Sequence, residues 1–386
     1  MNIQEKDREY IASTYARFPL TLVSGKGAKV YDENGKEYID LGSGIAVNVF
    51  GYCDDEWVKA VTEQLNKLQH TSNLFYSQPC AELAELLCKK TGMKKVFFSN
   101  SGAEANECAI KVARKYACEK KGKDTNVIIT LKNSFHGRTI TTLSATGQDS
   151  FHQDFLPLTE GFVYAEANNC EDLLSLVKEN KVAAIMFETV QGEGGVLPLE
   201  KEFVDTIFKV AKEEDIITIV DEVQTGNGRC GALYNYMNYG ITPDIVTTAK
   251  GIGGGLPLGA TMLGEKVKDT LKAGDHGSTF GGNPVASAGA LSIISRLDDT
   301  LLSEVKKKSQ YIFKALEGAE GVKSVSGAGL MIGIECEKDA LDVISYCREN
   351  GVIVIKAKNK VRLLPPINIE WEDLEKAMSV LIKGMR

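Results

Sequence analysis

Short apolar runs alternate with amphipathic segments through most of the chain. The runs rich in β-branched and aromatic residues, a composition typical of buried strands, lie at 95–99, 127–131, 183–187, 216–220, 245–248 and 260–263. Segments with apolar side chains at helical spacing lie at 54–68, 80–90 and 103–120. Strands that alternate with helices predict an α/β fold whose mostly parallel central sheet is flanked by helices.

The pattern changes at both ends of the chain. Near the start, two alternating runs flank the turn sequence DENG at 32–35, which predicts a hairpin. From Pro284 a long helix to Leu316 is predicted, followed by short strands and helices of α+β character. The predicted parts are an N-terminal segment that packs near the small domain, a large domain and a small C-terminal domain, namely residues 1–44, 45–284 and 285–386.

Composition limits the partners. The chain has 386 residues, of which 43% are apolar, and a formal net charge of -7. No block of like charge stands out, which argues against nucleic acid and anionic membranes as partners. The first ten residues are too polar for a signal peptide, and no apolar run is long enough to cross a membrane. We expect a soluble cytoplasmic protein with small-molecule substrates.

Cysteine and histidine are too dispersed for a metal site. The nine cysteines form no Cys-x-x-Cys pair, which argues for reduced thiols. The histidines are widely separated, at His70, His136, His152 and His276. We therefore expect no zinc or other metal ion.

Lys250 stands between a predicted buried strand and a glycine-rich loop, in TTAKGIGGGLPLG. An amine held at the carboxyl end of a buried strand is desolvated, which lowers its pKa and suits it to form a Schiff base with an aldehyde. The glycines let the backbone close around a bulky group. The alternative is a strand-end lysine that reaches solvent beside a flexible loop.

Polar residues follow other predicted strands. Asp221 ends the run ITIVD, where a carboxylate could keep a heteroaromatic ring nitrogen protonated or could cap the next element. Ser101 and Gly102 lead into a helix whose first amides could bind an anion, but serine is also a common N-cap. Arg138, in NSFHGRT, offers a planar fork for a carboxylate or lies at the surface.

Two later loops add to this set. ETVQGEGG at 188–195 puts acids and glycines after an apolar strand, and HGSTFGGNP at 276–284 supplies hydroxyls suited to phosphate. A lysine, an acid, two anion-binding loops, an aromatic face and an arginine together indicate one site.

These motifs resemble those of the class III, fold type I aminotransferases that use pyridoxal phosphate, and the resemblance covers nearly the whole chain. It is carried by FFSNSGAEANECAIKVAR, FHGRT, VDEVQTGNGRCG, PDIVTTAKGIGGGLPLGA and STFGGNP. The stretches GKGAKVYDENGKEYIDLGSGIAVN and HTSNLFYSQPCAELAELL resemble the members that act on N-acetylornithine. The resemblance implies pyridoxal 5'-phosphate as the cofactor and a homodimer with shared active sites.

The resemblance also implies roles for single residues. Lys250 would carry the cofactor and move the substrate proton, Asp221 would pair with the pyridinium nitrogen, and Gln224 would contact the phenolic oxygen. The other implied cofactor contacts are Ser101, Gly102, Ala103, Phe135, His136, Glu222, Val223 and Thr279 of the partner subunit. The implied substrate contacts are Arg138, Glu193, Arg362 and Ser278 of the partner subunit. Arg362 would take the α-carboxylate of 2-oxoglutarate, and Glu193 would adjust its availability between half-reactions.

The implied reaction is a ping-pong transfer. N2-acetyl-L-ornithine would give its terminal amine to the cofactor and leave N-acetyl-L-glutamate 5-semialdehyde, and 2-oxoglutarate would become L-glutamate, as in arginine biosynthesis. Succinylornithine, 4-aminobutyrate and an N-succinyl-diaminopimelate intermediate stay open as donors, and free ornithine is disfavoured because HTSNLFY resembles the group that acts on N-acetylornithine. An aminomutase that uses the same cofactor is disfavoured by Arg362, and a non-enzymatic regulator would have no use for the lysine, acid and arginine set.

One stretch departs from the family pattern. Many relatives have a histidine-proline motif where this chain reads GYCDD, residues 51–55. None of the implied cofactor residues lies in this loop. The departure therefore concerns local loop structure and side-chain selectivity.

Overall fold

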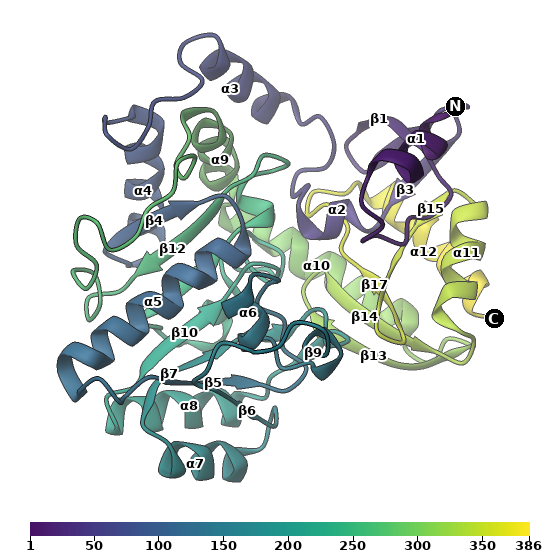
Figure 1. The fold of residues 1–386 in the computed structure, drawn as a ribbon. Coiled ribbons are helices and arrows are strands. Elements are labelled where there is room, and N and C mark those ends of the chain that lie inside the picture. The colour runs from purple at the N-terminus through teal and green to yellow at the C-terminus, as the bar shows by residue number, and fades with distance from the viewer.

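A seven-stranded sheet forms the centre of the computed structural model, which describes all 386 residues (Figure 1). In spatial order its strands are β4 (Lys95–Ser99), β12 (Gly259–Leu263), β11 (Ile245–Thr248), β10 (Ile217–Asp221), β7 (Val182–Phe187), β5 (Val127–Leu131) and β6 (Phe162–Ala165). Only β12 runs antiparallel to its neighbours, and the other pairs are parallel. The predicted α/β fold with a mostly parallel sheet is confirmed.

Helices flank this sheet because its central strands are apolar along their whole length. Every residue of β7, β10, β11 and β12 is buried. Helix α5 (Gly102–Lys121) lies on one side of the sheet, and α7 (Cys170–Glu179) and α8 (Lys201–Glu213) lie on the other (Figure 1). The edge strand β6 was not predicted, since its run FVYA is short and only its last residue is buried.

The N-terminal hairpin belongs to a second sheet. Its strands, in spatial order, are β1 (Leu22–Lys26), β2 (Lys29–Asp32), β3 (Glu37–Asp40) and β15 (Val352–Ile353). The pairing of β2 with β3 is antiparallel, as predicted, and β15 joins β3 in parallel from the other end of the chain. Helix α1 (Ile3–Tyr10) precedes this sheet, and Figure 1 shows both termini on this side of the molecule.

The C-terminal part carries a third sheet covered by helices. Its strands are β13 (Val322–Ala328), β14 (Met331–Cys336), β17 (Lys360–Leu363) and β16 (Ile355–Ala357). Its helices are α10 (Asp299–Leu316), α11 (Ala340–Glu349) and α12 (Trp371–Met385). The remaining elements are α6 (Ile140–Ala145), β8 (Val190–Gln191), β9 (Leu197–Pro198) and short 3-10 helices at Asp149–Phe151, Asn235–Tyr239 and Lys250–Ile252.

The single long helix predicted after Pro284 is wrong, because two helices occupy this stretch. Helix α9 (Pro284–Arg296) ends before Asp298, whose carboxylate caps α10 by accepting a hydrogen bond from the Leu301 amide at 2.9 Å. Helix α9 packs against α3 (Asp55–Leu65) and α4 (Gln78–Thr91). The division into 1–44, 45–284 and 285–386 stays a prediction. None of the helices is both long and apolar enough to cross a membrane.

Candidate active site

A cavity of about 480 Å³ opens at the carboxyl ends of the parallel strands, where open α/β sheets bind ligands. Loops after β4, β5, β7, β10 and β11 all contribute to it. Its walls are Val47, Asn100, Ser101, Gly102, Ala103, Asn106, Phe135, His136, Gly137, Arg138, Glu188, Asp221, Val223, Gln224, Ala249, Lys250 and residues 255–258. Most of the predicted site residues therefore meet in one place.

Lys250 lies half-buried in this cavity, directly after β11. Burial lowers the pKa of its amine below the usual value, against the opposing effect of the Glu193 carboxylate. The glycine loop after it is tightly folded, because a Cβ on Gly253 would lie 2.1 Å from the carbonyl oxygen of Leu256. Lys250 is therefore not a lysine that simply reaches solvent, and its role in forming a Schiff base stays a prediction.

Asp221 is held by a buried hydrogen-bond network. Its Oδ2 lies 2.8 Å from Nδ1 of His136 and accepts a hydrogen bond from the Asn106 amide at 2.8 Å. Its Oδ1 accepts a hydrogen bond from the Val223 backbone amide at 3.0 Å, so the carboxylate also caps the turn that follows β10. Thr247 donates to Oδ1 of Asn106 at 2.7 Å, which fixes the orientation of that amide. These hydrogen bonds therefore fix the orientation of the Asp221 carboxylate in the cavity.

Asn106 was not predicted as a site residue. It is 1% exposed and lies on the buried stripe of α5, seven positions before the buried Ala113 (113 - 106 = 7). A polar amide on an otherwise apolar helix face was the available signal, since buried polar groups need partners.

The Phe135 ring lines the cavity wall beside His136, and Phe151 packs behind it. The Phe135 and Phe151 rings meet edge to face with centroids 5.9 Å apart. The Arg138 guanidinium is exposed but lies 4.6 Å from the centroid of Phe151 and 5.7 Å from that of Phe135. Nε2 of His136 is buried and has no protein partner. Arg138 is thus a surface arginine whose position is set at the cavity mouth.

The start of α5 lies at the cavity, where an anion site is predicted. Ser101 is its N-cap and accepts the Glu104 amide at 3.2 Å, so the capping alternative also holds. The amides of Gly102 and Ala103 lie in the first turn, where no intrahelical acceptor is available. A Cβ on Gly102 would lie 2.7 Å from Val223 Cγ1, so the close approach of these two loops requires glycine.

Arg362 and Glu193 form a pair beside the cavity. Arg362, on β17, is 3% exposed, and its Nη1 donates to Oε1 of Glu193 at 2.7 Å and to Oε1 of Gln224 at 3.1 Å. Burial alone would raise the pKa of Glu193, but the Arg362 guanidinium holds it below its usual value. Nε of Arg362 has no partner.

Two further buried glutamates behave differently. Glu222 does not line the cavity, because its carboxylate accepts hydrogen bonds from Thr225 at 2.6 Å and from the amides of Asn235 and Tyr236 at 2.9 and 2.7 Å. Glu188 does line it, although it was not assigned a role from sequence. Burial raises the pKa of each carboxyl to about 7.

Glu188 bridges two loops of the cavity. One of its oxygens accepts the Phe135 amide at 3.0 Å, and the other accepts the Gly192 amide at 3.3 Å. Its signal in the sequence was its position, as the first polar residue after the fully buried strand β7. The loop that carries Phe135 is thereby fixed to the loop that carries Glu193.

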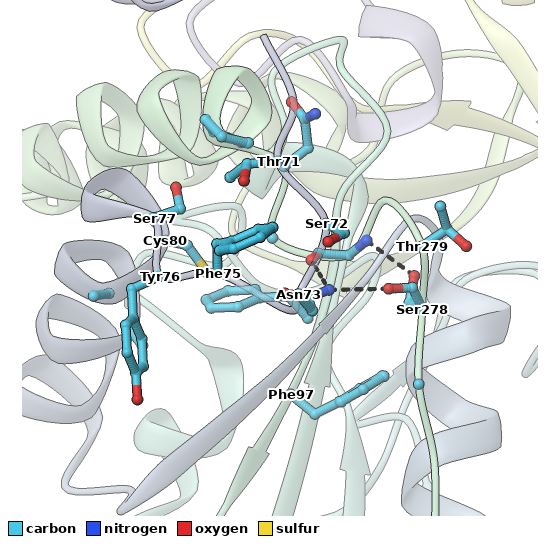
Figure 2. Close-up of a pocket in the computed structure, with 18 of the residues that line it drawn as sticks. Thr71, Ser72, Asn73, Phe75, Tyr76, Ser77, Cys80, Phe97, Ser278 and Thr279 are labelled. Carbon is cyan, nitrogen blue, oxygen red and sulfur yellow. Dashed lines mark hydrogen bonds between the residues drawn. The ribbon is translucent and has the colours of Figure 1, made fainter. Parts of the chain in front are cut away.

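Ser278 and Thr279 line a second cavity, of about 420 Å³, and the Ser278 hydroxyl accepts a hydrogen bond at 3.2 Å from Asn100, which lines the first. The second cavity lies between residues 70–77 and the loop 276–284 (Figure 2). Asn73 donates to the carbonyl oxygen of Ser278 at 2.9 Å, and the two residues lie side by side in Figure 2. Thr279 is exposed. Within one chain, neither hydroxyl lines the wall that holds Lys250.

A strained turn borders the cavity. Helix α2 (Ser43–Ala46) is one turn of left-handed backbone, with φ of 40° at Ser43, 60° at Ile45 and 64° at Ala46. Left-handed backbone costs a non-glycine residue about 1–2 kcal/mol. Such strain gathers at functional sites, and Val47, the next residue, lines the cavity. The sequence offered no sign of this turn.

No group of three or more histidine, cysteine, aspartate or glutamate side chains is arranged to hold a metal ion.

Comparison with known proteins agrees with this geometry. Residues 10–385 match the family described as aminotransferase class-III. The acetylornithine aminotransferase of Haemophilus ducreyi is 50% identical over 98% of this chain and 97% of its own length, and that of Methanocaldococcus jannaschii is 41% identical over 97% and 96%.

Solved structures give the same result. The crystal structure of ornithine aminotransferase from Toxoplasma gondii has a TM-score of 0.95 at 32% identity, over 99% of this chain and 94% of that one. N-acetylornithine aminotransferase from Stenotrophomonas maltophilia has a TM-score of 0.85 at 34% identity, over 98% and 97%.

Proposed function

We propose that this chain, which belongs to the class-III aminotransferases, transfers the terminal amine of N2-acetyl-L-ornithine to 2-oxoglutarate. The chain is a pyridoxal-phosphate-dependent aminotransferase. One observation carries the proposal: a desolvated lysine and an oriented aspartate line one cavity, and a buried arginine beside it donates to the lining residue Gln224. The choice of donor is supported by the relatives named acetylornithine aminotransferase.

The residues of the cavity fit the proposed cofactor. The Lys250 amine would bond to its aldehyde carbon, and the first-turn amides of Gly102 and Ala103 would hold its phosphate together with Ser101. Asp221 would face the ring nitrogen, and Phe135 would stack on the ring. When bound, the cofactor supplies an electron sink for a carbanion next to nitrogen.

The protein supplies proton transfer and orientation. A lysine whose pKa is lowered has a larger share of neutral amine, which can take a proton from the donor carbon in one half-reaction and, once protonated, give a proton to the acceptor carbon in the other. The hydrogen bonds from Asn106 and His136 keep Asp221 in one orientation throughout. We assign Gln224 and Val223 to the ring contacts, with His136 beside them, and Glu222 to supporting the loop that carries them.

Two arginines would bind carboxylates. The Arg362 guanidinium donates hydrogen bonds to Glu193 and Gln224 and so has protein partners when no dicarboxylic acid is bound. We propose that 2-oxoglutarate displaces Glu193 from Arg362, so that the two half-reactions use the same space in turn. Arg138, at the cavity mouth, would bind the carboxylate of N-acetylornithine.

We also propose a homodimer that completes each site. Ser278 and Thr279 do not line their own chain's cavity, and the exposed Thr279 could serve the partner's. Large apolar side chains stand exposed beside them: Leu74, Phe75, Tyr76 and Phe280. Such a patch marks an interface. A role in arginine biosynthesis and a cytoplasmic location stay predictions from the resemblance.

The visible absorption spectrum tests the proposal. A yellow band should fade when N-acetylornithine is added and return when 2-oxoglutarate follows. A band that ignores N-acetylornithine but responds to ornithine, succinylornithine or 4-aminobutyrate would keep the reaction and change the donor. Absence of any band after pyridoxal phosphate is supplied would contradict the assignment of Lys250.

A further inference from the structure

The loop that departs from the family pattern holds a buried hydrogen bond. Tyr52 donates its hydroxyl to Oδ2 of Asp40 at 2.7 Å. Asp40 is 3% exposed, and Tyr52 is half-buried. No lysine, arginine or histidine forms a salt bridge with Asp40, so the tyrosine hydroxyl is its side-chain donor.

Asp40 in turn holds the start of the left-handed turn. Its Oδ1 accepts the Gly42 amide at 2.7 Å, and Gly42 directly precedes the turn Ser43–Ala46. On its other side the turn is tied to the C-terminal part, since the Ser43 hydroxyl donates to the carbonyl oxygen of Leu364. Two carboxylate oxygens therefore link Tyr52 to a strained segment that ends at the cavity wall.

The position of Tyr52 is fixed independently of this bond. Its amide donates to the carbonyl oxygen of Gly27 at 2.8 Å, and its own carbonyl accepts the Gly27 amide at 2.9 Å. A Cβ on Gly25 would lie 2.9 Å from Cβ of Tyr52, and one on Gly51 would lie 2.4 Å from the oxygen of Gly27. Packing against Gly25 and the backbone hydrogen bonds to Gly27 hold Tyr52 in place, with its hydroxyl directed at Asp40.

We propose that Tyr52 is a positioning residue: through Asp40 it holds the turn Ser43–Ala46 in its left-handed form and so places Val47 against the bound donor amine. Left-handed backbone persists only where its surroundings enforce it, and here the enforcing contacts come from Asp40 and Leu364. The inference rests on the proposed function only in requiring a donor substrate.

Steady-state kinetics of Tyr52→Phe test it. Loss of one hydrogen bond to a charged group should raise KM for N-acetylornithine about tenfold. The value of kcat should stay within about twofold, because Lys250 and Asp221 are untouched.

Tyr38→Phe is the matched control. Tyr38 also donates a buried hydroxyl to a carboxylate, Oδ2 of Asp32 at 3.1 Å, in the same sheet but away from the turn. Both phenylalanine variants should lower the melting temperature slightly, and only Tyr52→Phe should change KM. An unchanged KM in Tyr52→Phe, or an equal rise in both variants, would overturn the proposal.

A second variant covers the case in which Tyr52→Phe does not fold. Asp40→Asn keeps the shape of the side chain and weakens both of its hydrogen bonds, so it should raise the donor KM in the same direction. A folded Asp40→Asn with the wild-type KM would also overturn the proposal. If wild-type enzyme ignores N-acetylornithine but accepts ornithine or glutamate, the proposed donor fails, and the same KM comparison is made with the accepted amine.

Discussion

The two cavities of this molecule differ in how complete they are. Around Lys250 and Asp221 the polar groups are buried and most have partners within the same chain. Beside Asn73 and Ser278, large apolar side chains stand exposed, and Tyr76 is fully exposed. The contrast fits the proposal that one chain carries the lysine and aspartate of the site by itself, whereas a second copy covers the exposed side chains beside the second cavity.

Removing the amine should have the largest effect on the complete cavity. Lys250→Ala should lower kcat at least about 10⁴-fold, because both the attachment point and the proton carrier are lost. The measurement is single-turnover bleaching of the cofactor band. Lys360→Ala removes another buried lysine, one that donates to Ser326, and should leave turnover near normal. Near-normal turnover in Lys250→Ala would mean that another group forms the Schiff base.

Breaking the arginine pair should affect one half-reaction. Arg362→Leu should raise KM for 2-oxoglutarate about 100-fold, because the buried guanidinium that would bind its carboxylate is lost and Glu193 is left unpaired. The donor half-reaction, followed by the fading of the band, should change much less. Arg114→Leu is the control, since its guanidinium donates only to backbone carbonyls of Asn126 and Glu160. Equal losses in both half-reactions would argue against a role in acceptor binding.

A charge on the open face should separate the subunits. Tyr76→Asp should shift the protein toward monomers in sedimentation, because a charge in an apolar interface must be desolvated. Activity should fall about tenfold on dilution as the phosphate contact from Thr279 of the partner subunit is lost. Leu341→Asp places the same charge at another exposed apolar position and should leave the assembly intact. A monomeric wild type with full activity would remove the distinction between the two cavities.

The buried glutamates should make stability depend on pH. The pKa of Glu222 is raised to about 7, so the folded state binds a proton that the unfolded chain releases above about 4.3. The free energy of unfolding should therefore fall as pH rises between these values, by up to about 3.5 kcal/mol for this group. Glu222→Gln should flatten the dependence of melting temperature on pH, and the exposed Glu349→Gln should not.

Local patterns predicted the strands of the central sheet well. The strands Lys95–Ser99, Val127–Leu131 and Ile245–Thr248 have the predicted bounds, and Val182–Phe187, Ile217–Asp221 and Gly259–Leu263 differ from the prediction by one residue, because a run of apolar side chains leaves few alternatives. The short edge strand β6 and the break before Asp298 were missed. In both places the pattern is weak, and tertiary contacts or a capping carboxylate decide the outcome.

The sequence by itself determined the α/β class and the presence of a lysine, an aspartate and an anion loop at strand ends, because alternation and strand-end polarity are local properties. Only the tertiary structure decided which of these residues meet. Arg362 reaches Glu193 across 169 positions, and Asn106 reaches Asp221 across 115. Such pairs depend on how the third sheet packs on the first and on which face of α5 is buried, and no short stretch of sequence encodes either.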